Sequence, residues 1–347
     1  MKKTILLLAF PIFCALTSCD GGSDDAIDPS SETETTKETT SKQVVNVNQN
    51  NRSADARYGR LEFPRLADSN NYVIIHTTSD NVDPDGINYC VEWDYKVKAQ
   101  RWTCYQITKA GNKQNVSRKD YGINPQYPID PELPLAYYLD RPSADYTTKD
   151  YFYYSWSGTY SGEAFDHGHI CPSYDRLYSR ESNDQTFYLT NMQPQYNNFN
   201  AGVWLSMENF VHKVGNSLST EDTLYICKGG TIGDVTIDGV TSSGVLKYVK
   251  DATAVGGDSL LVPKYFFSTF IVKKKGQYGA FAFWAEHKNT KLSSSAYLND
   301  YIISIDELER RTGIDFFCNF PDETENYLEA IPAEQIITAW SAYSNIK

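Results

Sequence analysis

The sequence predicts one α+β domain in residues 61–347, with a mixed, mainly antiparallel sheet as its core and helices flanking that sheet. Three observations support this fold class. Runs rich in β-branched and aromatic residues recur, whereas helical spacing of apolar residues appears in only a few segments. Hydrophobic residues make up 41% of the 347 residues, which is enough for a packed core. No repeat and no linker-like stretch divides residues 61–347, so we expect a single domain.

The β-prone runs give the expected strands. Two of them, INYCVEW and RWTCYQI, form a hairpin that turns near Val97 and sets Cys90 opposite Cys104. These two cysteines form a disulfide or remain as two buried thiols, and the sequence leaves both alternatives open. The full set of expected strands covers residues 72–76, 88–94, 102–108, 151–160, 186–195, 224–229, 261–272 and 278–284.

Helical patterns appear in three places. Apolar residues at helical spacing predict a helix over residues 200–214, with Gly215 just beyond its end. The stretch Ser304-Ile-Asp-Glu307 is a capping box, which opens a helix that stops at Gly313. A last helix is expected over residues 333–345.

The N-terminus has the pattern of an export signal. Two lysines precede an apolar run from Ile5 to Leu16, which is too short to span a bilayer comfortably. The following tetrad Leu16-Thr17-Ser18-Cys19 resembles the lipobox of bacterial lipoproteins, in which the cysteine is lipidated. The alternative is an ordinary secretory signal with an incidental cysteine. The resemblance implies a signal peptide at residues 1–19 and a chain anchored by lipid to the cell envelope, at the outer membrane or cell surface.

Residues 20–60 predict an acidic, disordered tether. The stretch DGGSDDAIDPSSETETTKETTSK is polar and poor in large apolar residues, so it cannot bury enough surface to fold. Residues 20–50 hold seven acids and two lysines, a net charge of −5. The tether therefore supplies part of the net charge of −12 of the whole chain. This total excludes a broadly basic nucleic-acid-binding surface, so an anionic substrate needs local cations or a metal ion.

Three polar residues suggest a hydrolytic site. His169 follows a strand-like run at the edge of a loop, and a helix then opens at Asn200 and carries Glu208. A histidine can act as a base near neutral pH, and the oxygens of Asn and Glu are hard ligands suited to Mg²⁺. Together they fit phosphodiester hydrolysis. Considered individually, the three residues have a simpler interpretation. They would be a core histidine, an N-cap asparagine and a solvated glutamate.

The order and spacing of three motifs resemble the DNA/RNA non-specific endonucleases of the ββα-metal type. The D-R-G-H motif of that family is matched by Asp166-His167-Gly168-His169, and N-x-x-P-Q by residues 191–195. The pattern N-x-G-x-W-x-x-x-E is matched by residues 200–208. Residues 101–108 and 306–317 resemble further family segments, so the resemblance covers roughly residues 72–325. It implies a ββα-metal finger at the active site.

The resemblance implies a role for each matched residue. His169 would be the general base that deprotonates the attacking water, and Asn200 would be the protein ligand of Mg²⁺. Glu208 would orient water bound to that metal, and Asn191 would support the site by hydrogen bonding. Arg118 aligns, across a variable loop, with an arginine that contacts the phosphate. A solvated surface arginine is an equally good reading of that position.

The chain departs from the family pattern at His167, where the family usually has arginine. Imidazole is smaller than guanidinium and loses its charge near neutral pH. We therefore expect His167 to contact the substrate more weakly, with Arg176 or Arg180 supplying the missing cation. Cys171, two residues after the expected base, is predicted to be a buried thiol rather than a nucleophile.

These inferences predict an exported endonuclease that depends on Mg²⁺, or another divalent cation such as Mn²⁺, and hydrolyses DNA and RNA. Two alternatives remain: a non-catalytic surface lipoprotein that binds nucleic acid, and a phosphodiesterase that acts on another substrate. The sequence does not predict an oligomeric state.

Overall fold

The computed structural model describes seven parts of the chain. The segment of residues 1–44, with the expected signal peptide, Cys19 and most of the tether, lies outside them, as do most of residues 151–160 and the end of the last expected helix. The described parts are residues 45–67, 71–120, 127–134, 159–160, 163–250, 259–291 and 298–340.

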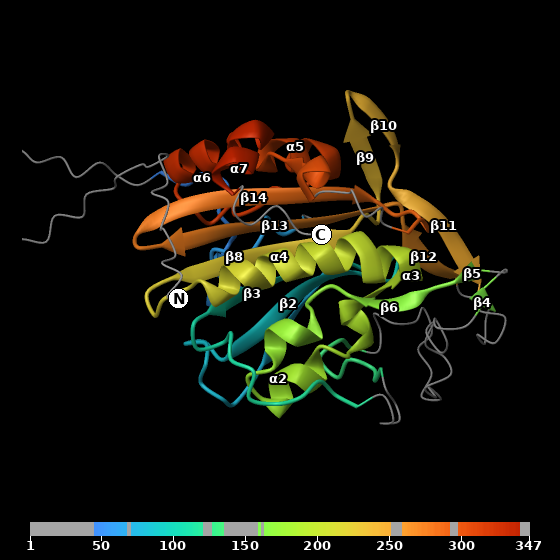
Figure 1. Cartoon of the computed structure of the whole chain (residues 1–347), viewed down its shortest axis with the longest axis horizontal. Coiled ribbons are helices and arrows are strands. Elements are labelled where there is room, and N and C mark those ends of the chain that lie inside the picture. Colours follow the sequence, from blue (N-terminus) through green and yellow to red (C-terminus); the bar gives the residue numbers. More distant parts are fainter. Residues whose placement is uncertain are drawn as a thin grey trace, which may run out of the picture.

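A seven-stranded antiparallel sheet forms the centre of the domain (Figure 1). Each neighbouring pair of strands is antiparallel, which confirms the predicted sheet type. In spatial order the strands are β1 (Tyr72–Thr77), β2 (Ile87–Asp94), β3 (Ala99–Thr108), β8 (Thr223–Gly230), β13 (Tyr265–Lys274), β14 (Gln277–Glu286) and β15 (Ile302–Ile303).

Helices and small strand pairs surround this sheet. No described helix is long and apolar enough to cross a membrane. The α-helices are α2 (Arg180–Gln185), α3 (Asn197–Phe199), α4 (Leu205–Asn216), α5 (Ile305–Thr312), α6 (Asp322–Glu329) and α7 (Ala333–Ala339). A π turn, η5 (Asn200–Trp204), lies between α3 and α4. The 3₁₀ turns are η1 (Ala56–Gly59), η3 (Ser173–Arg176), η4 (Leu189–Asn191) and η6 (Leu298–Tyr301). The paired short strands are β4 (Thr159–Tyr160) with β5 (Glu163–Ala164), β6 (Asp166–His169) with β7 (Met192–Gln195), β9 (Asp234–Ile237) with β10 (Val240–Ser243), and β11 (Val245–Lys250) with β12 (Ser259–Pro263).

Both faces of the sheet are buried, which explains why its strands read as nearly continuous apolar runs. Along β13, Phe266 and Phe270 belong to the core cluster that contains α4, whereas Phe267 and Ile271 belong to the cluster that contains α5 and α6. This alternation follows from the two-residue period of a strand. The sheet therefore separates two cores, which we call the α4 face and the α5–α6 face.

The element boundaries confirm some predictions and correct others. Ser304 Oγ accepts a hydrogen bond from the Glu307 backbone N–H, and α5 ends at Gly313 with a φ of +66°, as expected. The expected helix end at Gly215 is wrong, because α4 runs to Asn216. The expected strand 261–272 is also wrong as a single element: β12 ends at Pro263 and pairs with β11, and β13 begins at Tyr265.

The predicted hairpin register is confirmed. Cys90 lies opposite Cys104 in the ladder of β2 and β3, and Cys227 lies opposite Cys104 on the other side. All three side chains are buried free thiols, so the thiol alternative holds. Burial raises the pKa of the Cys104 thiol well above its usual range, because a thiolate is costly to desolvate.

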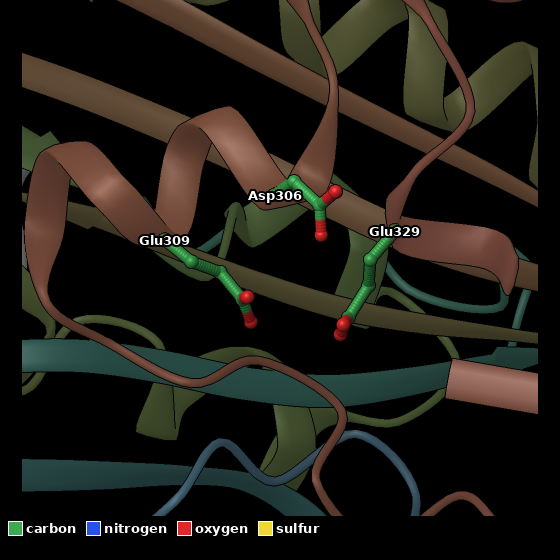
Figure 2. Close-up of side chains that lie close together, drawn as sticks. All are labelled: Asp306, Glu309 and Glu329. Atoms are coloured by element: carbon green, nitrogen blue, oxygen red, sulfur yellow. The ribbon is translucent and has the colours of Figure 1, made fainter. Parts of the chain in front are cut away.

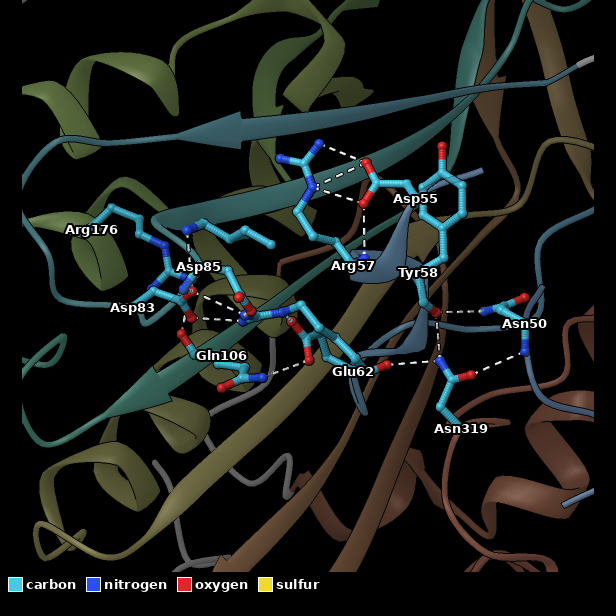
Figure 3. Close-up of polar contacts among 12 residues, drawn as sticks. Asn50, Asp55, Arg57, Tyr58, Glu62, Asp83, Asp85, Gln106, Arg176 and Asn319 are labelled. Atoms are coloured by element: carbon cyan, nitrogen blue, oxygen red, sulfur yellow. Dashed lines mark hydrogen bonds and ion pairs between the residues drawn. The ribbon is translucent and has the colours of Figure 1, made fainter. Parts of the chain in front are cut away.

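The C-terminal part of the predicted tether, residues 45–60, is ordered on the domain, which corrects the boundary placed at residue 61. The side chain of Asn50 is buried and donates hydrogen bonds to the carbonyls of Tyr58 and Pro64. Asn319 donates to the carbonyl of Tyr58 and accepts from the Asn50 backbone N–H (Figure 3). The composition of this segment suggested solvation, but asparagine amides can satisfy irregular backbone that has no ladder of its own.

We predict that Asn50→Ala lowers the free energy of unfolding by about 2–4 kcal/mol, because it leaves buried backbone groups without partners. These are the carbonyl of Pro64, which accepts from Asn50 Nδ2, and the N–H of Leu66, which donates to Asn50 Oδ1. Denaturant titration of the purified protein measures the loss. The exposed neighbour Gln49 supplies the control, and Gln49→Ala is expected to cost less than about 0.5 kcal/mol. Equal losses in the two variants would contradict the packing role of Asn50.

Candidate active site

The three motifs fold into one ββα unit on the α4 face. Strand β6 pairs antiparallel with β7, so that His169 lies opposite Met192 and Gly168 opposite Gln193. The chain then enters α3, the π turn and α4 (Figure 1). A Cβ at Gly168 would lie 2.3 Å from the Cδ of Gln195, so any other residue at this position would have to displace that buried side chain. The ββα arrangement that the resemblance implied is confirmed.

A π turn separates the two oxygen-bearing residues of the helix. Asn200 begins this turn, and Glu208 lies in the first turn of α4. In a regular α-helix, side chains eight residues apart are rotated by about 80° from one another. Gly202, with φ −109° and ψ −108°, is not helical, so the chain between the two residues is kinked and this regular offset does not apply.

Asp166 fixes the orientation of Asn200. The Nδ2 of Asn200 donates to Asp166 Oδ2 at 3.0 Å, and the Nδ2 of Asn197 donates to the same oxygen at 3.0 Å. With its nitrogen held by a carboxylate, the amide of Asn200 turns its Oδ1 away from Asp166. The amide oxygen is therefore left available as a hard ligand.

His169 is held in place by Trp204 and by aromatic neighbours. Trp204 Nε1 donates to the backbone carbonyl of His169 at 3.1 Å, and the His169 ring meets the Phe187 ring edge-on at 5.0 Å between centroids. Its Nε2 is shielded from water and has no hydrogen-bond partner in the described chain. Burial, aided by the charge of Arg118, lowers the pKa of His169 to about 3. The ring is thus a neutral imidazole at pH 7, with a nitrogen that can accept a proton.

Glu208 lies beside a buried lysine. Lys228, on β8, has no exposed surface; its Nζ is 3.5 Å from Glu208 Oε1 and 4.6 Å from the centre of the Trp204 ring. Burial raises the pKa of Glu208 to about 7, and the charges of Lys228 and Arg118 oppose this rise. The carboxyl therefore changes its charge close to neutral pH.

Arg118 lies next to the expected base. Its guanidinium is 5.3 Å from the centre of the Phe187 ring, the same ring that contacts His169. Its charge acts on the pKa values of both His169 and Glu208. The structure therefore brings four of the sequence-predicted residues to one site: His169, Asn200, Glu208 and Arg118.

Asn191 supports the chain that follows β6. Its Oδ1 accepts from the Cys171 backbone N–H at 2.8 Å, and its Nδ2 donates to the carbonyls of Cys171 and Thr186. This fully buried amide fixes the chain just after β6. Burial raises the pKa of the Cys171 thiol to about 12, which agrees with the predicted buried thiol and disfavours a thiolate nucleophile.

The two residues expected to contact substrate beside His169 differ in position. His167 stacks on Tyr127, with ring centroids 3.8 Å apart and planes 10° apart. The prediction for Arg176 is wrong: it is only 1% exposed, stacks on Tyr105 and donates to the carbonyl of Gln106. Because its side chain is buried against the sheet, Arg176 cannot supply the missing arginine. Arg180 is exposed and pairs with Asp184 on α2.

Sequence reasoning missed the contacts that orient the site. Lys228 carried a readable signal, because it is the single charged residue in the apolar strand TLYICKGG, and a buried lysine is rare without a partner. Tyr127 carried none, since it lies 40 positions before His167 in a loop. The contact of Trp204 with a carbonyl also had no sequence signal beyond its place in the motif.

The donors at the site fit a divalent cation such as Mg²⁺. The amide oxygen of Asn200 is turned away from its anchor Asp166, and the carboxylate of Glu208 is partly exposed. Both are hard oxygen donors, and so few protein ligands suit an ion that keeps several waters. The unpartnered Nε2 of His169 is not needed as a ligand in this arrangement.

Comparisons with known proteins agree with the geometry. A nuclease of Nostoc sp. is 26% identical over 264 residues, which are 73% of this chain and 79% of that protein. The mitochondrial nuclease EXOG of Xenopus laevis is 24% identical over 232 residues, 67% of this chain and 57% of that protein. The chain thus spans little more than half of the Xenopus relative.

The fold also matches a solved structure. The crystal structure of the EndoG/EndoGI complex aligns with a TM-score of 0.52 and 17% identity, covering 71% of this chain and 86% of that one. The sequence profile described as DNA/RNA non-specific endonuclease matches residues 69–323, which include all three motifs of the ββα unit. The chain belongs to the family of DNA/RNA non-specific endonucleases.

Proposed function

We propose that this protein is a divalent-metal-dependent endonuclease that hydrolyses phosphodiester bonds of DNA and RNA. The observation that carries the proposal is the ββα unit itself. In support of it, β6 carries the neutral His169 with an unpartnered, shielded nitrogen, and Asp166 on the same strand anchors the side chain of Asn200. A divalent cation bound there would neutralise charge at the scissile phosphate and on the leaving oxygen.

Each residue of the site would have a separate role in the reaction. His169 Nε2 accepts the proton of the attacking water, since the ring is neutral at physiological pH. Asn200 would hold the cation, and Glu208, when ionised, would orient water bound to that cation. Arg118 donates to the phosphate, and the arriving negative charge offsets the effect of Arg118 on His169. The pKa of His169 would therefore rise when substrate binds, which makes it a stronger base.

Selectivity is expected to be low. Contacts to phosphate carry no sequence information, and both DNA and RNA present the same phosphodiester. Arg118, which packs on Phe187, and the His167–Tyr127 stack, whose Tyr127 ring is 6.4 Å from that of His169, are groups near the proposed base that could contact nucleic acid. Because the net charge is −12, binding would depend on these local groups and on the cation rather than on long-range attraction.

The proposal predicts that the purified protein degrades both plasmid DNA and RNA with Mg²⁺ and loses activity in EDTA. His169→Ala is expected to lower kcat by about 10²–10⁴, because the base that accepts the proton is gone. Leu205→Ala, an exposed position on α4, is the control and should retain wild-type activity. Nucleic-acid binding without cleavage would favour the non-catalytic alternative. Wild-type cleavage by His169→Ala would contradict the assigned base.

The raised pKa of Glu208 predicts a pH-dependent affinity for Mg²⁺. The carboxyl is protonated below about pH 7 and ionised above it, so cation binding should weaken as pH falls through 7. The expected loss is up to about tenfold in Kd per pH unit below that value. Isothermal titration calorimetry of the metal-free protein measures it. In Glu208→Gln the affinity should be weaker and nearly flat with pH; an unchanged pH profile would exclude Glu208 as the titrating group.

We further propose that the chain is exported and anchored by lipid at Cys19, as the tetrad Leu16-Thr17-Ser18-Cys19 suggests. Acyl chains would then hold the nuclease at the cell envelope. Cys19→Ala is expected to move the protein from the membrane fraction to the soluble fraction and to abolish incorporation of labelled palmitate. Ser18→Ala, which keeps a small residue before the cysteine, is the control. Labelling of Cys19→Ala at the wild-type level would exclude this anchor.

A further inference from the structure

Three carboxylates meet on the α5–α6 face, away from the nuclease site. Asp306 and Glu309 lie one turn apart on α5, and Glu329 lies at the end of α6 (Figure 2). One carboxylate oxygen from each lies within 4.8 Å of the other two. Figure 2 shows the three side chains converging from the two helices on one point. Like charges at this spacing repel, so the arrangement needs protons or a cation to be stable.

Glu329 is the observation that points to a ligand. Its side chain is 5% exposed, and its Oε1 is shielded from water without a hydrogen-bond partner in the described chain. An unpartnered buried carboxylate oxygen is costly. The nearest arginines in the sequence do not reach it: Arg310 and Arg311 both pair with Glu307 on the outer side of α5.

The surroundings add further negative charge. Asp315 and Glu325 flank the cluster, and Asn48 donates to both of them from the N-terminal segment. Burial raises the pKa of Glu309 and that of Glu329, and repulsion from the neighbouring carboxylates raises both further. A group whose pKa is raised on folding favours the folded state at low pH and costs stability as pH rises above about 4.5. Without a cation, these carboxyls must retain protons at neutral pH, and this costs the domain stability.

We propose that Asp306, Glu309 and Glu329 bind a calcium ion that joins α5 to α6. All the donors are carboxylate oxygens, which are the ligands of hard cations. The three oxygens lie within 4.8 Å of one another, so a single ion can contact all of them. Ca²⁺ accepts oxygens at about 2.3–2.6 Å in a flexible geometry, which suits carboxylates that come from two helices. Mg²⁺ also dehydrates reluctantly, which disfavours it in a buried carboxylate site.

This site is separate from the nuclease site. Ile305, Leu308 and Leu328, the apolar neighbours of the three carboxylates along α5 and α6, belong to the core cluster on the opposite side of the sheet from α4. The proposed role is structural. The ion would be bound by carboxylates of both helices and would offset the repulsion between those carboxylates. It does not rest on the nuclease activity, and its test needs no substrate.

The test measures Ca²⁺ binding and thermal stability of the full chain after treatment with EGTA. At neutral pH, saturating Ca²⁺ should raise the Tm by about 5 °C, and metal analysis after dialysis should find one tightly held Ca²⁺. Asn200→Ala, which removes the proposed catalytic ligand, should keep both properties. Glu329→Gln should lose both, whereas Glu323→Gln, an exposed position on the same helix, should behave as wild type.

Glu309→Gln provides a second variant in case Glu329→Gln does not fold, and it should also lose the Ca²⁺ response. The proposal is overturned if Ca²⁺ leaves the Tm of the wild-type chain unchanged. It is also overturned if the Ca²⁺ response disappears in Asn200→Ala and persists in the Glu309 and Glu329 variants. A Tm that rises on acidification but not with Ca²⁺ would show that the carboxyls share protons instead.

Discussion

The hydrogen bond from Trp204 Nε1 to the carbonyl of His169 joins the parts of the active site. It ties the start of the helix to the end of β6, and thereby links His169 to the helix that carries Asn200 and Glu208. The Trp204 ring is fully buried, packs on Phe266 of the sheet and lies under the ammonium of Lys228. The position of the site relative to the sheet therefore depends on the packing of the Trp204 ring.

Much of the site could be predicted because its residues occur in short motifs. His169, Asn191, Asn200 and Glu208 were identified from order and spacing, and the structure brings them to one ββα unit. Arg176 could not be judged in the same way, since sequence alone does not tell whether a cation beside a motif points outward or stacks on a buried ring. Long-range partners decide that question, and spacing carries no information about them.

The fold, like the site, could be predicted from the sequence only where local patterns determine it. The antiparallel strands were predictable because β-branched and aromatic residues favour strands locally, and the hairpin register of Cys90 and Cys104 followed from its turn. The order of residues 45–60 was not predictable, because its hydrogen-bond partners lie more than 250 positions away: the Asn48 side chain donates to Asp315, and the Asn50 backbone N–H donates to Asn319. A composition that reads as solvated can therefore belong to the folded unit when distant backbone offers partners.

The ordered N-terminal segment also determines how the domain is presented. Asn46 donates to the carbonyls of Cys318 and Phe320, and Asn48 reaches Asp315 and Glu325, so this segment runs over the α5–α6 face. His169 and Asn200 lie across the sheet, on the α4 face. The described chain therefore begins on the face of the sheet opposite the candidate active site. The proposed lipid attachment, if it holds the chain, would join the domain on that opposite face and leave the α4 face clear for long nucleic acid.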